Sequence, residues 1–157
     1  MTDDGIAGGC PCHAVRYRLT DRPLFVHACH CTWCQRETGS AFVLNAIIEA
    51  RLVEVDGDTV AVNTPSASGR GQIIHRCPTC QIALWSIYSG FGPRFLFMRA
   101  GTFDTPVAPD IHIFTGTKAP WLNLDGGAPV VEEYYRRSLY WPDWAQARRE
   151  AELARTD

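Results

Sequence analysis

Seven cysteines are the feature that most constrains how this 157-residue chain can fold. Three of them, Cys29, Cys31 and Cys34 (here the cysteine trio), fall within six residues, too close for each to form a disulfide of suitable geometry. All three can instead point at one metal ion. Zinc takes thiolate ligands in a tetrahedral arrangement, and a site with only three protein ligands leaves the fourth position to water or substrate. The trio therefore predicts a catalytic zinc site.

The other four cysteines (here the four-cysteine group) form two pairs, Cys10 with Cys12 and Cys77 with Cys80. The gap of two residues in the second pair lets a tight turn aim both sulfur atoms inward, and Pro78 stiffens that turn. In an extended segment, residues 10 and 12 point the same way. The two pairs predict a four-thiolate structural zinc, so we expect two zinc ions per chain.

A disulfide-bonded secreted protein and a redox dithiol at Cys77 and Cys80 are the alternatives to metal binding. The chain opens with Met-Thr-Asp-Asp-Gly and shows no apolar signal segment. An odd number of cysteines also fits poorly with disulfide bridges. Metal binding is therefore favoured over both alternatives, and reduced thiols without an export signal are typical of a cytoplasmic protein.

The order of the cysteine motifs, closing with Lys118-Ala119-Pro120-Trp121, resembles the glutathione-dependent formaldehyde-activating enzyme family, which also includes centromere protein V. The resemblance runs from about Gly8 to Trp121. It implies a mainly β fold of small antiparallel sheets, a beta-tent, with structural zinc at the four-cysteine group and catalytic zinc at the trio. Gln81 departs from the glycine that the family often has there. A left-handed glutamine would be strained, so we expect the turn to differ in detail.

The resemblance also implies an activity, that of a carbon–sulfur lyase or synthase that joins glutathione and formaldehyde as S-hydroxymethylglutathione. Zinc lowers the pKa of a bound thiol, so a small thiol substrate can bind at the trio as a thiolate and attack the aldehyde. Two other hypotheses stay open: a non-catalytic, zinc-stapled binding or chaperone-like module, and an enzyme that acts on a different thiol. The sequence identifies no general base.

Five residues near the motifs are candidates for substrate binding, as walls of the metal pocket or as cations. They are Trp33, Arg36, Arg70, Lys118 and Trp121. A cation near the metal can bind a glutathione carboxylate through charge-assisted hydrogen bonds, whereas Trp33 can equally pack in the core. His30 is a possible fourth zinc ligand, but adjacent residues of a strand point to opposite faces, so we interpret it as a neighbour.

Length and composition fit a single zinc-binding domain over residues 1–157, with a core at about 8–121 and a C-terminal extension at 122–157. The chain is 46% hydrophobic and 20% charged. Its formal net charge of -2 disfavours non-specific nucleic-acid binding. No apolar run reaches the roughly 20 residues that span a bilayer. We therefore expect neither nucleic acid nor membrane as a partner, and the sequence indicates no oligomeric state.

Short apolar or alternating segments, separated by turns, predict strands along most of the chain. The predicted strands are 13–19, 24–28, 41–48, 51–55, 59–62, 72–76, 82–89, 94–98 and 110–114. Between the fourth and fifth of these, Asp56-Gly57-Asp58 predicts a hairpin.

Two further segments have a clear local character. Residues 63–71 have the composition of a mobile loop without apolar periodicity. Pro142-Asp143 predicts the start of a helix that runs to about Ala154, because the segment is rich in Ala, Glu and Arg. We expect Trp141 and Trp144 to anchor this helix on the outside of the domain.

Overall fold

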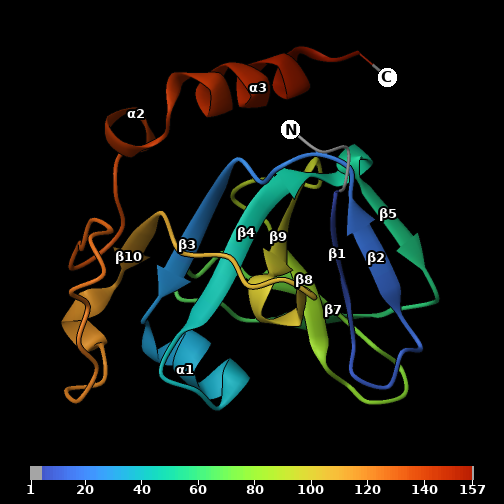
Figure 1. Ribbon diagram of the computed structural model, residues 1–157, viewed down its shortest axis with the longest axis horizontal. Coiled ribbons are helices and arrows are strands. Elements are labelled where there is room, and N and C mark those ends of the chain that lie inside the picture. Colours follow the sequence, from blue (N-terminus) through green and yellow to red (C-terminus); the bar gives the residue numbers. More distant parts are fainter. Residues whose placement is uncertain (1–4, 157) are drawn as a thin grey trace.

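The computed structural model describes residues 5–156, and this part of the chain is mainly β, as predicted (Figure 1). Its ten strands are β1 (Ile6–Gly9), β2 (Arg16–Leu19), β3 (Phe25–Cys29), β4 (Val43–Glu49), β5 (Val53–Asp56), β6 (Val60–Thr64), β7 (Gln72–Arg76), β8 (Ala83–Tyr88), β9 (Phe95–Arg99) and β10 (Ile111–Ile113). Its α-helices are α1 (Thr32–Thr38), α2 (Arg137–Tyr140) and α3 (Asp143–Ala154). The predicted C-terminal helix is confirmed by α3.

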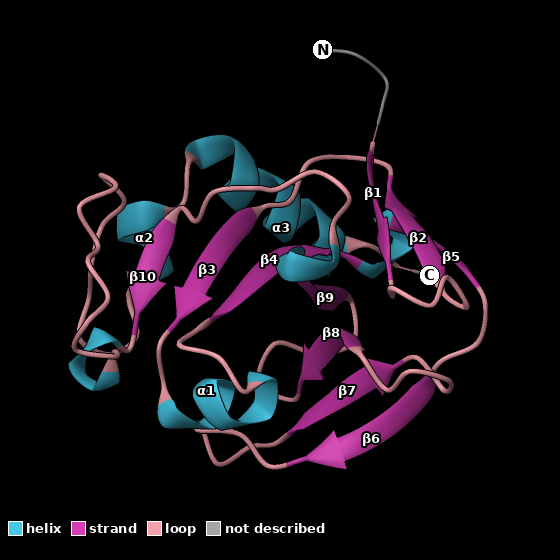
Figure 2. Cartoon of the chain, turned by 60° about the horizontal axis from the view of Figure 1, so that its bottom comes forward, coloured by secondary structure: helices cyan, strands magenta, loops and turns pink. Residues whose placement is uncertain are grey.

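The strands form two sheets. One has the order β1-β2-β5, and the other has the order β10-β3-β4-β9-β8-β7-β6 and curves so that α1 lies within its opening (Figure 2). The pairs are antiparallel except that β10 runs parallel to β3, with Ile113 opposite Cys29. This parallel pair adds to the antiparallel sheets that were predicted. It brings the carboxyl ends of both strands to one edge, where the cysteine trio begins.

The predicted hairpin at Asp56-Gly57-Asp58 is wrong, although strands lie on both sides of it. β5 pairs with β2 and β6 pairs with β7, so the chain passes here from one sheet to the other. Gly57 has a φ of 100°, and a Cβ atom on it would lie 2.2 Å from the carbonyl oxygen of Ala14. The glycine therefore serves a close backbone contact with the segment before β2, which local sequence does not reveal.

The central strands β3, β4 and β9 separate two hydrophobic cores, because successive side chains of a strand point to opposite faces. The first core lies between the sheets and includes Tyr17, Leu19, Val26, Ala46, Ile48, Met98, Cys10 and Cys77. The second lies on the other face and includes Phe25, Ile47, Phe95, Phe97, Tyr135, Trp141, Cys29 and Cys31. The four-cysteine group and the trio therefore belong to different cores.

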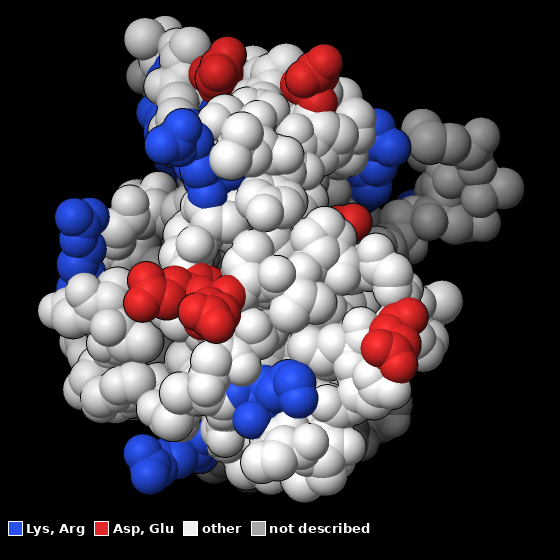
Figure 3. Space-filling view, turned by 90° about the vertical axis from the view of Figure 1, so that its left-hand side faces the viewer, with Lys and Arg blue, Asp and Glu red and all other residues white. Residues whose placement is uncertain are grey.

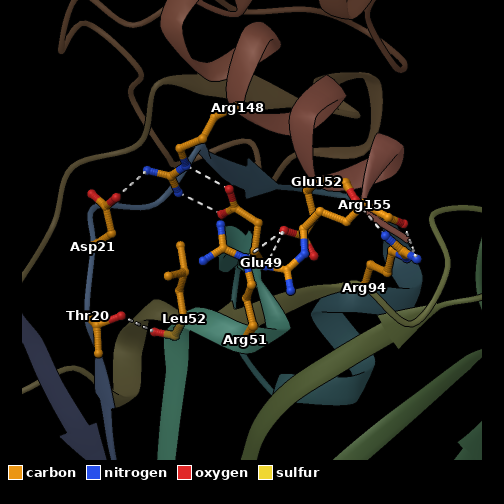
Figure 4. Close-up of polar contacts among 9 residues, drawn as sticks. All are labelled: Thr20, Asp21, Glu49, Arg51, Leu52, Arg94, Arg148, Glu152 and Arg155. Carbon is orange, nitrogen blue, oxygen red and sulfur yellow. Dashed lines mark hydrogen bonds and ion pairs between the residues drawn. The ribbon is translucent and has the colours of Figure 1, made fainter. Parts of the chain in front are cut away.

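Helix α3 covers the second core and is held there by a buried ion pair (Figure 4). The carboxylate of Glu49, fully buried at the end of β4, accepts two hydrogen bonds of 2.7 Å from Nε and Nη2 of Arg148. Arg148 also pairs with Asp21 at 3.2 Å. Trp141 is buried and Trp144 packs against the same core, as expected for anchors of this helix. We call the contacts of Glu49, Arg148 and Asp21 the C-terminal clasp.

Candidate metal centres and the adjoining pocket

The four-cysteine group has the geometry of a tetrahedral metal site. The sulfur atoms of Cys10, Cys12, Cys77 and Cys80 all lie within 4.8 Å of one another. Cys12 Sγ lies 3.5 Å from Cys10 Sγ and 3.6 Å from Cys77 Sγ. Two sulfur atoms bound to one zinc at about 2.3 Å would be about 3.8 Å apart, whereas a disulfide is about 2 Å long. The four thiols are free and could hold zinc.

Backbone N–H groups in both loops of this group point at sulfur. Val15 N–H donates to Cys10 Sγ at 3.4 Å, and Cys80 N–H donates to Cys77 Sγ at 3.5 Å. The bond from Cys80 is the main reason that the pKa of the Cys77 thiol falls to about 6. Hydrogen bonds to the charged form favour that form, so the loop is suited to a thiolate ligand.

The turn after Cys80 keeps a left-handed residue, and Gln81 occupies it with a φ of 64°. Its backbone N–H donates to the carbonyl of Cys77 at 3.0 Å, and its side-chain amide donates to the carbonyl of Pro78 at 2.9 Å. The turn thus accepts the strain of a glutamine instead of changing shape.

The cysteine trio lies where β3 ends and α1 begins, and its three sulfur atoms are also within 4.8 Å of one another. Cys29 is the last residue of β3. Cys31 is the N-cap of α1, and its sulfur accepts the N–H of Cys34 at 3.3 Å. Hydrogen bonds from the thiols of Cys29 and Cys34, and then from backbone N–H groups, lower the pKa of Cys31 to about 2. The pKa values of Cys29 and Cys34 are raised instead, so Cys31 is the member of the trio that ionises most readily. The three sulfur atoms together could hold a metal.

His30 lies between two members of the trio but faces elsewhere. Its side chain is fully buried, and Nε2 lies 3.0 Å from Nδ1 of His112. Its carbonyl accepts hydrogen bonds from Gln35 of α1 at 2.7 Å and from Thr117 at 3.0 Å. This geometry agrees with the interpretation of His30 as a neighbour of the metal ligands, and it ties the trio to the segment that follows β10.

A pocket of about 380 Å³ opens beside the trio. Its floor is the face of the seven-stranded sheet that also carries the second hydrophobic core, and Asn45 and Phe97 belong to it. The loop after β6 forms one wall of the pocket. Of the described residues that line it, none is acidic and two are arginines, Arg70 and Arg137. The lining also includes His27, Cys29, Cys31, Trp33, Cys34, Ser66, Ala67, Ser68, Gln72, Tyr88, Gly90, Phe91, Ile113, Phe114 and Tyr134. The pocket therefore combines thiols, aromatic walls and positive charge.

A family model described as glutathione-dependent formaldehyde-activating enzyme matches residues 5–117. The chain belongs to this family. The crystal structure of a Rhodobacter sphaeroides protein is 15% identical, with a TM-score of 0.47, over 80% of this chain and 99% of that chain. A comparison with curated proteins gave no match. The part that matches the formaldehyde-activating enzyme family ends before α2 and α3, so Arg137 and, of the C-terminal clasp, Arg148 lie outside it.

The five expected substrate-binding residues of this formaldehyde-activating family member fall into two sets. Trp33 and Arg70 line the pocket, and Trp33 is 48% exposed, so it forms a wall and not part of the core. Arg36 is exposed on α1 and lies outside the lining. The ammonium of Lys118 donates to the carbonyls of Ala119 and Leu122, and Trp121 is 77% exposed. Arg36, Lys118 and Trp121 therefore do not face the pocket.

Among the pocket residues that were not predicted from the sequence, three bear most on function. Arg137 and Tyr134 come from the C-terminal extension, where no local pattern marks them as neighbours of the trio. Asn45 carries a signal that sequence reasoning could have used, since it is one polar residue within the apolar segment Ala41–Ile48. A buried side-chain amide in such a strand needs a hydrogen-bond partner or a functional role that explains its burial.

The helices and the surface bear on the expectations about membranes and nucleic acid. Within residues 5–156 no helix has the length and apolar character needed to cross a membrane. On the face shown in Figure 3, basic and acidic side chains form small separate groups within a largely uncharged surface. The absence of a nucleic-acid partner stays a prediction from the net charge.

Proposed function

We propose that this protein joins a carboxylate-bearing thiol, with glutathione as the first candidate, to formaldehyde, and cleaves the same carbon–sulfur bond in reverse. The observation that carries the proposal is that the three thiols open onto a pocket whose described lining has two arginines and no acidic group. Membership of the formaldehyde-activating enzyme family supports the choice of substrates.

The donor sets suit two zinc ions, one held by Cys29, Cys31 and Cys34 and one held by the four-cysteine group. Zinc at the trio would supply a site that lowers the pKa of a substrate thiol and fixes its sulfur. The four-cysteine group lies in the other core, so its contribution is to hold the loops of Cys10 and Cys77 together.

The pocket residues bind and orient the thiol. Each arginine presents a planar fork of donors that matches a carboxylate, and glutathione has two carboxylates for Arg70 and Arg137. Phe91 and Phe97 provide apolar surface that excludes water from the reacting atoms. Because Arg137 belongs to this pocket, we propose that residues 122–157 are part of one domain with the rest.

The reaction needs little acid–base chemistry from the protein. The sulfur of the thiolate attacks the carbonyl carbon, a carbon–sulfur bond forms, and the π electrons of the carbonyl move to its oxygen. The thiol gives its proton to solvent when the thiolate forms, and the oxygen of the adduct takes one proton from solvent. Thiol plus formaldehyde therefore balances with the S-hydroxymethyl adduct.

The proposal is tested with the zinc-loaded full chain. Calorimetry measures glutathione binding, and NMR follows adduct formation above the uncatalysed rate. Arg70→Ala and Arg137→Ala should each weaken glutathione binding by about 1.5 to 3 kcal/mol, the cost of a lost hydrogen bond to a charged group. Arg36→Ala is the matched control, since that arginine lies outside the pocket, and its binding should equal that of the wild type.

Two outcomes would contradict the proposal. If glutathione binds with equal affinity to the wild type and to both pocket variants, the substrate does not use these arginines. If the wild type binds glutathione but does not accelerate adduct formation, a zinc-stapled binding module describes the protein better.

A further inference from the structure

A row of three polar side chains crosses the sheet face that forms the pocket floor. His27 of β3 lies opposite Asn45 of β4, which in turn lies opposite Arg99 of β9. Residues directly opposite in adjacent strands point to the same face, and Cys29 shares the face of His27. All three side chains are buried, with exposures of 2%, 3% and 5%. Polar groups buried this deeply in apolar strands need an explanation.

Arg99 fixes the orientation of the Asn45 amide. Nη1 of Arg99 donates to Oδ1 of Asn45 at 2.5 Å. Because a guanidinium has donors only, the atom that faces it must be the amide oxygen, which settles the orientation of the side chain. Within residues 5–156 the amide nitrogen of Asn45 has no hydrogen-bond partner, and Asn45 lines the pocket. The two N–H donors are therefore left for a group in the pocket.

Arg99 also places a positive charge behind this amide. Among the described residues no carboxylate pairs with Arg99, and its Nε has no hydrogen-bond partner. Its charge does act on the Cys34 thiol and the Tyr88 hydroxyl, where it favours the ionised forms. A buried cation without a carboxylate favours negative charge nearby, and a donor chain polarised by a cation makes a stronger final donor. The charge of Arg99 thus favours the thiolate of Cys34 and also a further anion that forms beside the trio.

Several other polar groups of the pocket are already engaged, although the side-chain oxygen of Gln72 has no partner. Nε2 of His27 is hydrogen-bonded to the hydroxyl of Tyr135 at 2.5 Å. The amide nitrogen of Gln72 donates to the carbonyl of Pro65, and the hydroxyls of Ser66 and Ser68 bond to each other. Asn45 differs from these groups because its partner occupies only its acceptor.

We propose that Asn45 is a catalytic hydrogen-bond donor to the oxygen of the aldehyde and that Arg99 is its positioning residue. The inference rests on the proposed function and deepens it. As the carbon–sulfur bond forms, the π electrons of the carbonyl move to oxygen, and the N–H groups of Asn45 stabilise the resulting oxyanion until it takes a proton from solvent. A donor that is in place before the reaction stabilises the transition state without reorganisation.

The test uses the zinc-loaded full chain and separates rate from binding. Asn45→Leu should lower kcat for adduct formation by about 10²-fold or more, the usual loss when an oxyanion donor is removed, while glutathione affinity and zinc content stay at wild-type values. Arg99→Met should reproduce the loss of kcat, and Arg99→Lys, which keeps a donor and the charge, should restore part of it. Asn63→Leu, at an exposed asparagine of β6, is the matched control and should change nothing.

Each result is decisive once circular dichroism shows a folded variant with full zinc content. Asn45→Ser and Asn45→Asp are measured as well, so that the question is answered even where leucine disrupts folding. A wild-type kcat in any folded variant that lacks an amide at position 45 overturns the inference, and so does a loss of glutathione affinity that matches the loss of kcat. A wild type that binds glutathione without forming the adduct marks a failure of the proposed function instead.

Discussion

Replacing Arg148 with methionine tests how the C-terminal extension is held on the protein. The Glu49 side chain is fully buried, and that of Arg148 is 19% exposed. Two hydrogen bonds of 2.7 Å join them, and a third, of 2.9 Å, runs from Nη2 of Arg148 to the carbonyl of Arg22. Arg148→Met leaves the Glu49 carboxylate buried without this partner. We therefore expect a large loss of stability from one substitution near the surface.

The size of the loss follows from the burial of the carboxylate. Removing one partner of a buried ion pair costs about 3 to 5 kcal/mol, because the remaining charge is uncompensated. For a chain of this size each kcal/mol lowers the Tm by about 2 to 4 °C, so the variant should melt roughly 6 to 20 °C lower. The double variant Glu49→Met with Arg148→Met removes both charges and should recover most of the loss, since apolar pairs often replace buried ion pairs without cost.

Thermal unfolding followed by circular dichroism at fixed zinc measures these differences. Arg16→Met is the matched control, because Arg16 pairs with Asp104 in solvent, where the side chains are 34% and 50% exposed. Exposed pairs contribute little, so the control should melt close to the wild type. If the single and double variants at the clasp melt at the same temperature, the loss comes from packing and the charge argument is refuted.

Three further results are expected. Cys80→Ser should unfold or grossly destabilise the protein, since structural zinc contributes on the order of 10 kcal/mol to folding in zinc-folded peptides; a folded variant with an unchanged melting curve would contradict this. Limited chelation should remove the metal of the trio first and leave the protein folded. Cys31→Ser should likewise empty the trio of metal at little cost in stability. One titration that follows zinc release and circular dichroism checks it, and loss of fold with the first zinc would make the trio structural. Gln81→Gly should stabilise the protein by about 0.5 to 1 kcal/mol, because glycine relieves the strain of the left-handed backbone at this position. Denaturant unfolding measures the difference. A destabilised variant would show that the hydrogen bond from the Gln81 side chain to the carbonyl of Pro78 contributes more than the strain costs.

Nine of the ten strands of the described residues were predictable from sequence because their signals are local, whereas β1 (Ile6–Gly9), which ends in two glycines, was missed. Val15, Tyr17 and Leu19 alternate with arginines, and the segment at Gln72–Arg76 is a strand with the predicted bounds. Partners are not local, so the pairing of β5 with β2 and the parallel pairing of β10 could not be predicted. Helix α1 was missed because cysteine spacing dominated the interpretation of that segment, although Gly39, with a φ of 61°, marks its C-terminal end as glycine often does.

The metal ligands were predictable for a different reason from the rest of the site. Each pair or trio of cysteines is close in sequence, so spacing alone indicates a shared ion. The pocket, by contrast, is assembled from β4, the loop after β6 and the C-terminal extension. Arg70 was among the expected cations, but nothing local distinguishes it from Arg36 or connects Arg137 to the trio. Asn45 was recognisable as a polar exception in an apolar strand, but its role depends on Arg99 across the sheet.

The place of Cys31 at the start of α1 makes this helix a reporter of the state of that one sulfur atom. The helix has seven residues and none of them is buried, so it depends on its ends more than on packing. Alkylation or oxidation of Cys31 would take away the acceptor for the Cys34 N–H and release the first turn. Amide hydrogen exchange in residues 32–38 would then speed up while the strands stay protected. The amide exchange rates of this short helix would thus report, residue by residue, whether the sulfur of Cys31 is modified.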